Sequence, residues 1–179
     1  MSLHTHFRAM AENNAWSNRR LLRACRPLSE TEIWAPRTSF FPSIGATLNH
    51  ILIVDWFYVD ALTSGGRGRS VYALETPYRA IEDLACAQMK SDGALTSFCA
   101  SLEDGDLSRS IVLDRGPRGQ LLDTIGAVLP HLFTHQIHHR GQVHAMLSGT
   151  PIKPPQLDEF FLAEDRSHRE EAEMKEAGN

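Results

Sequence analysis

The sequence predicts an all-α protein, a four-helix bundle with longer connections and a small β-hairpin before the fourth helix. Four stretches carry apolar residues at helical spacing, and two short strand-like runs flank a turn sequence. Of the 179 residues, 42% are hydrophobic, which suits one globular domain. We therefore assign residues 1–163 to the bundle and residues 164–179 to a charged C-terminal tail.

The first half of the chain predicts two helices. Apolar residues at helical spacing place the first helix over residues 4–26. Residues 27–42 contain three prolines and are expected to form a connection. Ser43 is the predicted N-cap of a second helix that runs to about Leu62 and is apolar nearly all round, so it should be buried. Residues 64–70, SGGRGRS, predict a flexible loop.

The third predicted helix covers residues 78–103, and Gly93 weakens it without ending it. Its apolar side is expected to hold Ile81, Leu84, Ala85, Met89, Leu95, Phe98 and Leu102. After it, Ser110–Leu113 and Gln120–Leu122 flank the sequence DRGPRG, which predicts a short hairpin.

The fourth predicted helix begins at a cap formed by Asp123 or Thr124 and runs to about Ser148. Pro130 lies inside it, so either the helix is kinked there or its regular part begins near that point. The following PPQLDEFFLAED is expected to be a connector and a short amphipathic piece, after which the charged tail is a solvated or frayed helix.

Charge and composition exclude several classes of protein. The formal net charge is −4, so no nucleic-acid partner is expected, and the arginines of the first helix, Arg19, Arg20, Arg23 and Arg26, are expected to be solvated. No apolar run reaches the ~20 residues of a membrane span, and the start lacks a signal-peptide pattern. We therefore expect a cytoplasmic location, with Cys25, Cys86 and Cys99 as core-filling thiols.

Histidines are the most informative residues of the sequence. The chain has nine, and five of them fall between residues 131 and 144. If His135 is set to zero on a helix of 100° per residue, the others lie at about −40° (His131), −60° (His138), +40° (His139) and 180° (His144). Four of the five therefore share one sector, and His131/His135 and His135/His139 both have the i, i+4 spacing of a metal-binding pair.

A metal ion needs a further ligand, and His50 is the natural one. It lies among apolar residues in LNHILIV, where the ring nitrogens of a buried imidazole need partners. Three histidines with open positions are typical of a catalytic metal site. No glutamate follows His135, so the HExxH pattern of zinc proteases is absent.

Three stretches resemble the DinB family of DinB/YfiT-like metalloenzymes. They are NNAWSNRRLL (13–22), LNHILIVDWFY (48–58) and HLFTHQIHHRGQV (131–143), and PPQLDEFF also fits. The resemblance implies a four-helix bundle that holds nickel or zinc through His50, His135 and His139, which favours the 135/139 pair. His138, Arg140 and Gln142 match the rest of the fourth-helix motif and are expected to orient ligands or shape packing.

Relatives in that family include transferases that depend on a small thiol, so the resemblance implies an electrophile and a thiol as partners, and a homodimer. Three neutral imidazoles leave the charge of a divalent ion uncompensated, so a bound thiol would lose its proton and become a nucleophile. A bound water could act in hydrolysis instead. The alternative is a metal-binding bundle without catalysis that acts in stress response. We lean towards an enzyme.

Overall fold

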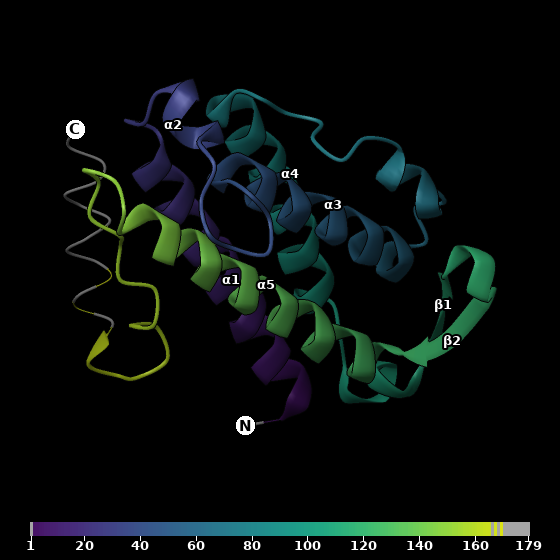
Figure 1. Cartoon of the computed structure of the whole chain (residues 1–179). Helices are drawn as coiled ribbons and strands as arrows, with labels where there is room; N and C mark the ends of the chain where they lie inside the picture. Colours follow the sequence, from purple (N-terminus) through teal and green to yellow (C-terminus); the bar gives the residue numbers. More distant parts are fainter. Residues whose placement is uncertain (1, 166, 168, 170–179) are drawn as a thin grey trace.

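The computed structural model describes residues 2–165, 167 and 169, and it confirms a mostly helical fold with one small hairpin (Figure 1). Helix α1 packs against α4 and α5, and helix α3 packs against the same two helices, which makes a four-helix bundle. The four long helices are α1 (Leu3–Cys25), α3 (Ile44–Thr63), α4 (Ile81–Ala100) and α5 (Ile125–Leu147).

Side-chain caps fix where the helices begin. Ser43 caps α3 as predicted, because its hydroxyl accepts a hydrogen bond from the Ala46 N–H. Of the two residues predicted for α5, Thr124 is the cap. Helix α5 begins at Ile125 and includes Pro130, so the prediction that its regular part begins only near that residue is wrong. The first turns of α5 bury apolar side chains, and this burial outweighs the one hydrogen bond that a proline lacks.

Part of the predicted connection over residues 27–42 is helical. The three prolines of this segment had indicated a connection without a helix. Helix α2 (Glu30–Trp34) starts with a capping box, in which Ser29 and Glu32 each bind the other's backbone N–H through their side chains. The Trp34 indole N–H donates to the Arg79 carbonyl at 3.2 Å. The capping box fixes the start of α2, and the Trp34 contact joins its end to the segment just before α4.

The third predicted helix was too long, and its apolar face was partly misplaced. The Tyr78 backbone pairs with the Asn49 side chain through two hydrogen bonds, at 2.8 and 3.0 Å, which keeps Tyr78 outside α4. Met89 is 66% exposed, although it was expected on the apolar side, whereas Gln88 and Asp92 are buried. The buried stripe of α4 therefore contains a polar pair.

The predicted hairpin is present. Strands β1 (Ser110–Asp114) and β2 (Gln120–Thr124) pair antiparallel, with Val112 opposite Leu122. Since Thr124 ends β2 and caps α5, the hairpin leads directly into that helix (Figure 1). The described residues also form three short 3-10 helices, η1 (Gly68–Ala73), η2 (Asp104–Ser108) and η3 (Gly116–Arg118). The first of these occupies part of the predicted flexible loop.

The core has two apolar halves with buried polar residues between them. One half, at the hairpin end, contains Phe7, Phe57 and Leu129, and the other contains Leu21 and Leu147. On α1, α4 and α5 buried polar residues lie between the two halves, and on α3 the buried Asp55 lies beside Ile53 and Val54 of the hairpin-end half. We call the buried polar residues that hydrogen bonds link across these four helices the polar layer, and they are Asn14, Asn18, Asp55, Gln88, Asp92, Gln136 and Arg140.

The remaining expectations have mixed outcomes. Cys25 and Cys99 are buried, but Cys86 is exposed, so it does not fill the core.

The connector after α5 is irregular where an amphipathic piece was expected, and Phe160 packs on Trp16 with ring centroids 5.6 Å apart. Most of the predicted tail over residues 164–179 lies outside the described residues. Within the described part of the chain, no helix combines the length and the apolar character that crossing a membrane requires.

Candidate metal centre

His50 on α3 and His135 and His139 on α5 lie together, and they form a group that could hold a metal ion. One nitrogen from each ring lies within 4.8 Å of the others. The Nε2 atoms of His50 and His135 are 3.0 Å apart. The ring of His139 lies 4.7 Å from that of His50 and 4.4 Å from that of His135, measured between centroids. We call this group the three-histidine site.

The fold explains why these three rings meet. His135 and His139 are one helical turn apart, so they project from the same face of α5. Helix α3 packs against α5 and carries His50 towards that face. His139 is buried and the other two rings are half-buried, so the site lies at the edge of the bundle.

The surroundings keep the three imidazoles neutral. Burial, reinforced by the nearby His139, lowers the pKa of His50 to about 4 and that of His135 to about 3. Burial also lowers the pKa of His139. A neutral imidazole has a free lone pair, which is the form that binds a metal ion.

The donor set fits a divalent cation. Two imidazole nitrogens that face each other at 3.0 Å need a proton or a cation between them. The other ring nitrogen of His135, Nδ1, is buried and has no hydrogen-bond partner among the described residues. The ring of His135 is therefore not held by hydrogen bonds to the polar groups around it. Nickel and zinc both accept imidazole ligands.

Two further motif residues lie beside the site. The Nδ1 atom of His139 is 2.8 Å from Oε1 of Gln142, and Nε2 of Gln142 is 3.2 Å from Nε2 of His138. Gln142 therefore bridges a ring of the site and the exposed ring of His138.

The other clustered histidines have different partners. The ring of His131 packs against Tyr58, with centroids 5.3 Å apart. Nε2 of His144 lies 3.1 Å from the Pro155 carbonyl oxygen, away from the three-histidine site. The helical angles alone had left His131 and His138 possible, and the group that the structure brings together contains neither.

Phe41 is a residue of this site that the sequence did not reveal. Its ring centroid lies 4.2 Å from that of His50 and 5.6 Å from that of His139. It belongs to the segment PRTSFFPS, where nothing in the spacing distinguishes Phe41 from its neighbour Phe40. Phe41 covers one side of the site with apolar surface.

Comparison with known proteins identifies the family. The model of the DinB family matches residues 1–173. The chain belongs to the DinB family. Protein DinB of Bacillus subtilis strain 168 is 25% identical over 142 residues, which are 76% of this chain and 81% of that protein.

Solved DinB-like structures share the fold. One, from Bacillus cereus ATCC 10987, has a TM-score of 0.63 at 17% identity and covers 81% of this chain and 91% of its own. A second, from Bacillus subtilis, has a TM-score of 0.59 at 16% identity and covers 83% of this chain and 96% of its own.

In this DinB chain, Arg140 lies in the polar layer of the core. Its Nη1 donates to Oδ1 of Asn18 at 3.0 Å and to Oδ1 of Asn14. The amide groups of the same two asparagines donate to Oδ1 of Asp92, at 2.9 and 3.2 Å. The asparagines therefore connect a buried guanidinium to a buried carboxylate.

Asp55 is the second carboxyl of the polar layer. Gln88 donates to its Oδ2 at 2.7 Å, and Gln136 donates to its Oδ1. Burial, followed by the nearby Asp92, raises the pKa of Asp55 to about 8, and burial raises that of Asp92 to about 6. Burial therefore disfavours the charged form of both carboxyl groups, and the buried guanidinium of Arg140 opposes this effect at each of them.

The polar layer has a signal in the sequence. Asn14 and Asn18, Gln88 and Asp92, and Gln136 and Arg140 are each one turn apart on otherwise apolar helix faces, and they were missed. Because Gln136 and Arg140 directly follow His135 and His139, the layer fixes the stretch of α5 that carries these two histidines.

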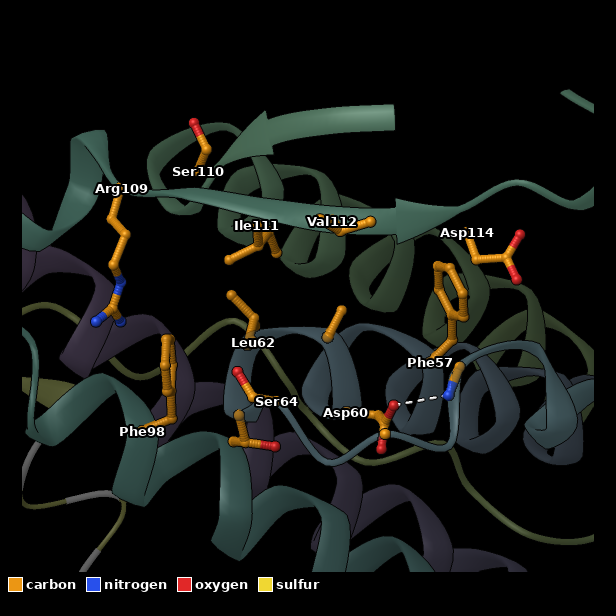
Figure 2. A pocket seen from close by; sticks show the side chains of 14 residues that line it. Phe57, Asp60, Leu62, Ser64, Phe98, Arg109, Ser110, Ile111, Val112 and Asp114 are labelled. Atoms are coloured by element: carbon orange, nitrogen blue, oxygen red, sulfur yellow. Dashed lines mark hydrogen bonds between the residues drawn. The ribbon is translucent and has the colours of Figure 1, made fainter. Parts of the chain in front are cut away.

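A cavity of about 830 Å³ lies at the hairpin end of this DinB bundle, apart from the histidines. Figure 2 shows Ile111 of β1 facing Leu62 of α3 across it, with Arg109 at one side. None of the three histidines lines this space. The cavity is therefore separate from the three-histidine site.

Proposed function

We propose that this protein binds one divalent metal ion, nickel or zinc, through His50, His135 and His139 and acts as a metal-dependent enzyme of the small-thiol S-transferase type. The observation that carries the proposal is the convergence of three neutral imidazoles from two helices on one point. Three ligands leave coordination positions for other molecules, as in catalytic sites.

The metal ion would supply a positive charge that acts on the molecule bound to it. A divalent ion held by three uncharged rings lowers the pKa of a thiol or a water that coordinates it, so a nucleophile is available at neutral pH. Small thiols are the first choice, because relatives that the sequence resembles use them.

The side chains of this chain would supply position and shielding. Gln142 holds the ring of His139 by accepting from its Nδ1–H, so that Nε2 faces the site. Phe41 keeps water from one side of the rings of His50 and His139. Since the rings of His50 and His135 are only half-buried, small molecules have an approach from solvent.

The transfer itself balances without a redox partner. The thiol gives up its proton to solvent, and its sulfur forms a bond to an electrophilic carbon of the acceptor. The leaving group departs with the electron pair of the bond that breaks. The products are a thioether and the protonated or anionic leaving group.

A screen of small thiols with electrophilic acceptors tests this proposal. Metal-loaded protein should consume thiol faster than metal-stripped protein, and His139→Ala should abolish the difference. His144→Ala is the matched control, because this ring lies on the same helix and contacts Pro155 instead. If metal-loaded and metal-stripped protein react equally slowly with every pair, the non-catalytic metal-binding bundle replaces the enzyme.

We also propose that the chain forms a homodimer. The support is the DinB membership together with exposed apolar side chains on two packed helices, Leu3 of α1 and Ile137 of α5, which are 62% and 52% exposed. Size-exclusion chromatography with light scattering should give twice the 20.0 kDa chain mass. A mass of one chain would contradict the dimer.

A further inference from the structure

A second cavity at the hairpin end has an arginine-rich wall. Its volume is about 480 Å³, and it lies between the loop of the hairpin and η1. The lining residues are Phe57, Arg69, Tyr72, Asp114, Arg115, Pro117 and Arg118. Three guanidinium groups therefore face this space with one carboxylate, although the whole chain carries a net charge of −4.

Aromatic residues of α3 hold the central arginine. Nη2 of Arg115 donates to the Tyr58 hydroxyl at 3.0 Å, and its guanidinium lies 5.6 Å from the Tyr58 ring and 5.7 Å from the Phe57 ring. Both aromatic side chains are buried, so they form a fixed support. A guanidinium held in this way loses little further freedom when it binds a ligand.

Arg69 reaches the same space from η1 because residue 116 is glycine. Gly116 has a φ of +63°, and a Cβ there would lie 1.8 Å from Nη1 of Arg69. The positive φ favours glycine here, and the absence of a Cβ lets the Arg69 guanidinium lie directly against the turn. Arg69 and Arg115 also act on the hydroxyl of Tyr72, where they oppose the burial that raises its pKa to about 12.

The positive charge of this wall has no ion-pair partner in the described part of the chain. Across the described residues, no ion pair involves Arg69, Arg115 or Arg118. The one lining carboxylate, Asp114, accepts from the backbone N–H of Gly116 at 2.8 Å. Clustered guanidinium groups with free donors are the usual partners of carboxylate and phosphate groups.

We propose that this arginine cavity binds an oxyanion group, a carboxylate or a phosphate, of the small molecule that reacts at the three-histidine site. The inference rests on the proposed function for the reacting end of that molecule. Phe57 follows His50 by seven residues on α3, a rise of about 10 Å. His131, one turn before His135 on α5, packs against Tyr58, which in turn accepts from Arg115. The ligand is therefore an anionic compound long enough to span on the order of 10 Å between its charge and its reactive group.

Titration of the full-length protein with succinate, inorganic phosphate and neutral succinamide at constant ionic strength tests the cavity. NMR or calorimetry should show saturable binding of succinate or phosphate and none of succinamide, and the anion that binds identifies the group. Arg69→Ala combined with Arg118→Ala should weaken this binding at least tenfold. Arg109→Ala is the matched control, because it removes an arginine at the other end of β1 and should change binding less than twofold.

Arg118→Ala alone is a second variant in case the double variant does not fold. Arg118 is exposed, and its side chain makes no hydrogen bond or ion pair with any described residue, so the fold should tolerate its loss. Arg118→Ala should weaken binding several-fold. Equal anion binding by wild type and these variants, or no saturable binding of either anion, would overturn the proposal. The binding assay needs neither a thiol nor a metal. A failure of the arginine cavity is therefore distinguishable from a failure of the three-histidine site.

Discussion

Oε1 of Gln142 lies 2.8 Å from Nδ1 of His139, one turn earlier on α5. An amide oxygen only accepts hydrogen bonds, so Nδ1 carries the hydrogen and Nε2 keeps its lone pair for an ion. The same amide reaches His138 through its nitrogen. Gln142 thus fixes both the tautomer and the orientation of one ring of the three-histidine site.

Replacement of Gln142 should weaken metal binding without unfolding the protein. Gln142→Ala removes the acceptor for His139 and should lower metal affinity by on the order of 10- to 100-fold. Gln142→Glu retains an acceptor oxygen and should stay close to wild type. Competition with a chelator of known affinity measures both. Equal affinity of wild type and Gln142→Ala would show that this contact does not orient His139.

Replacement of Arg140 should destabilise the fold. Arg140→Met leaves the buried side-chain oxygens of Asn14 and Asn18 without their donor, which costs about 1–3 kcal/mol for each unsatisfied group, and it removes the positive charge nearest the buried Asp92. Urea denaturation at pH 7 measures the free energy of unfolding. Arg8→Met is the control, because its pair with Glu12 is exposed and contributes little. If Arg140→Met is as stable as Arg8→Met, the polar layer does not hold the bundle.

Asp55 should make stability depend on pH. Because its pKa is higher in the folded than in the unfolded protein, its contribution is complete below about pH 4 and is lost as the pH rises through about 8. Asp55→Asn removes this loss. The free energy of unfolding of wild type should therefore fall relative to the variant by up to about 1.4 kcal/mol per pH unit in that window. A difference that stays constant from pH 5 to 8 would show that the pKa of Asp55 is not raised in the folded protein.

Phe41 should slow the release of metal. Phe41→Ala exposes the rings of His50 and His139 to solvent, so a chelator should remove metal from this variant several times faster than from wild type. Phe40→Ala is a close control, since Phe40 is the next residue and is 78% exposed. Equal release rates for the two variants would mean that Phe41 does not shield the site.

The sequence predicted the helices and hairpin because their signals are local. Apolar periodicity, the caps at Ser43 and Thr124 and the turn sequence DRGPRG each act within a few residues. It did not predict α2, because the prolines around that segment indicate a connection, although Ser29 and Glu32 have the spacing of a capping box. Met89 was misplaced because an apolar residue on an exposed face has the same spacing as a core residue.

The site was only partly predictable for a related reason. Helical angles limit which histidines of α5 share a face, but they cannot select the pair that meets His50, since that depends on how α3 packs on α5. Phe41 lies in a connection and contacts His50 in a helix, so no regular spacing of residues along the sequence indicates this contact. The bonds that link Arg140 to Asn14 and Asn18 likewise span residues far apart in the sequence.

Metal content tests the central claim most directly. Wild-type protein loaded with nickel or zinc and then desalted should hold about one ion per chain by elemental analysis. His50→Ala, His135→Ala and His139→Ala should each lose most of it, whereas His144→Ala should retain it. Folded His50→Ala and His139→Ala variants that keep the wild-type metal content would contradict the three-histidine site.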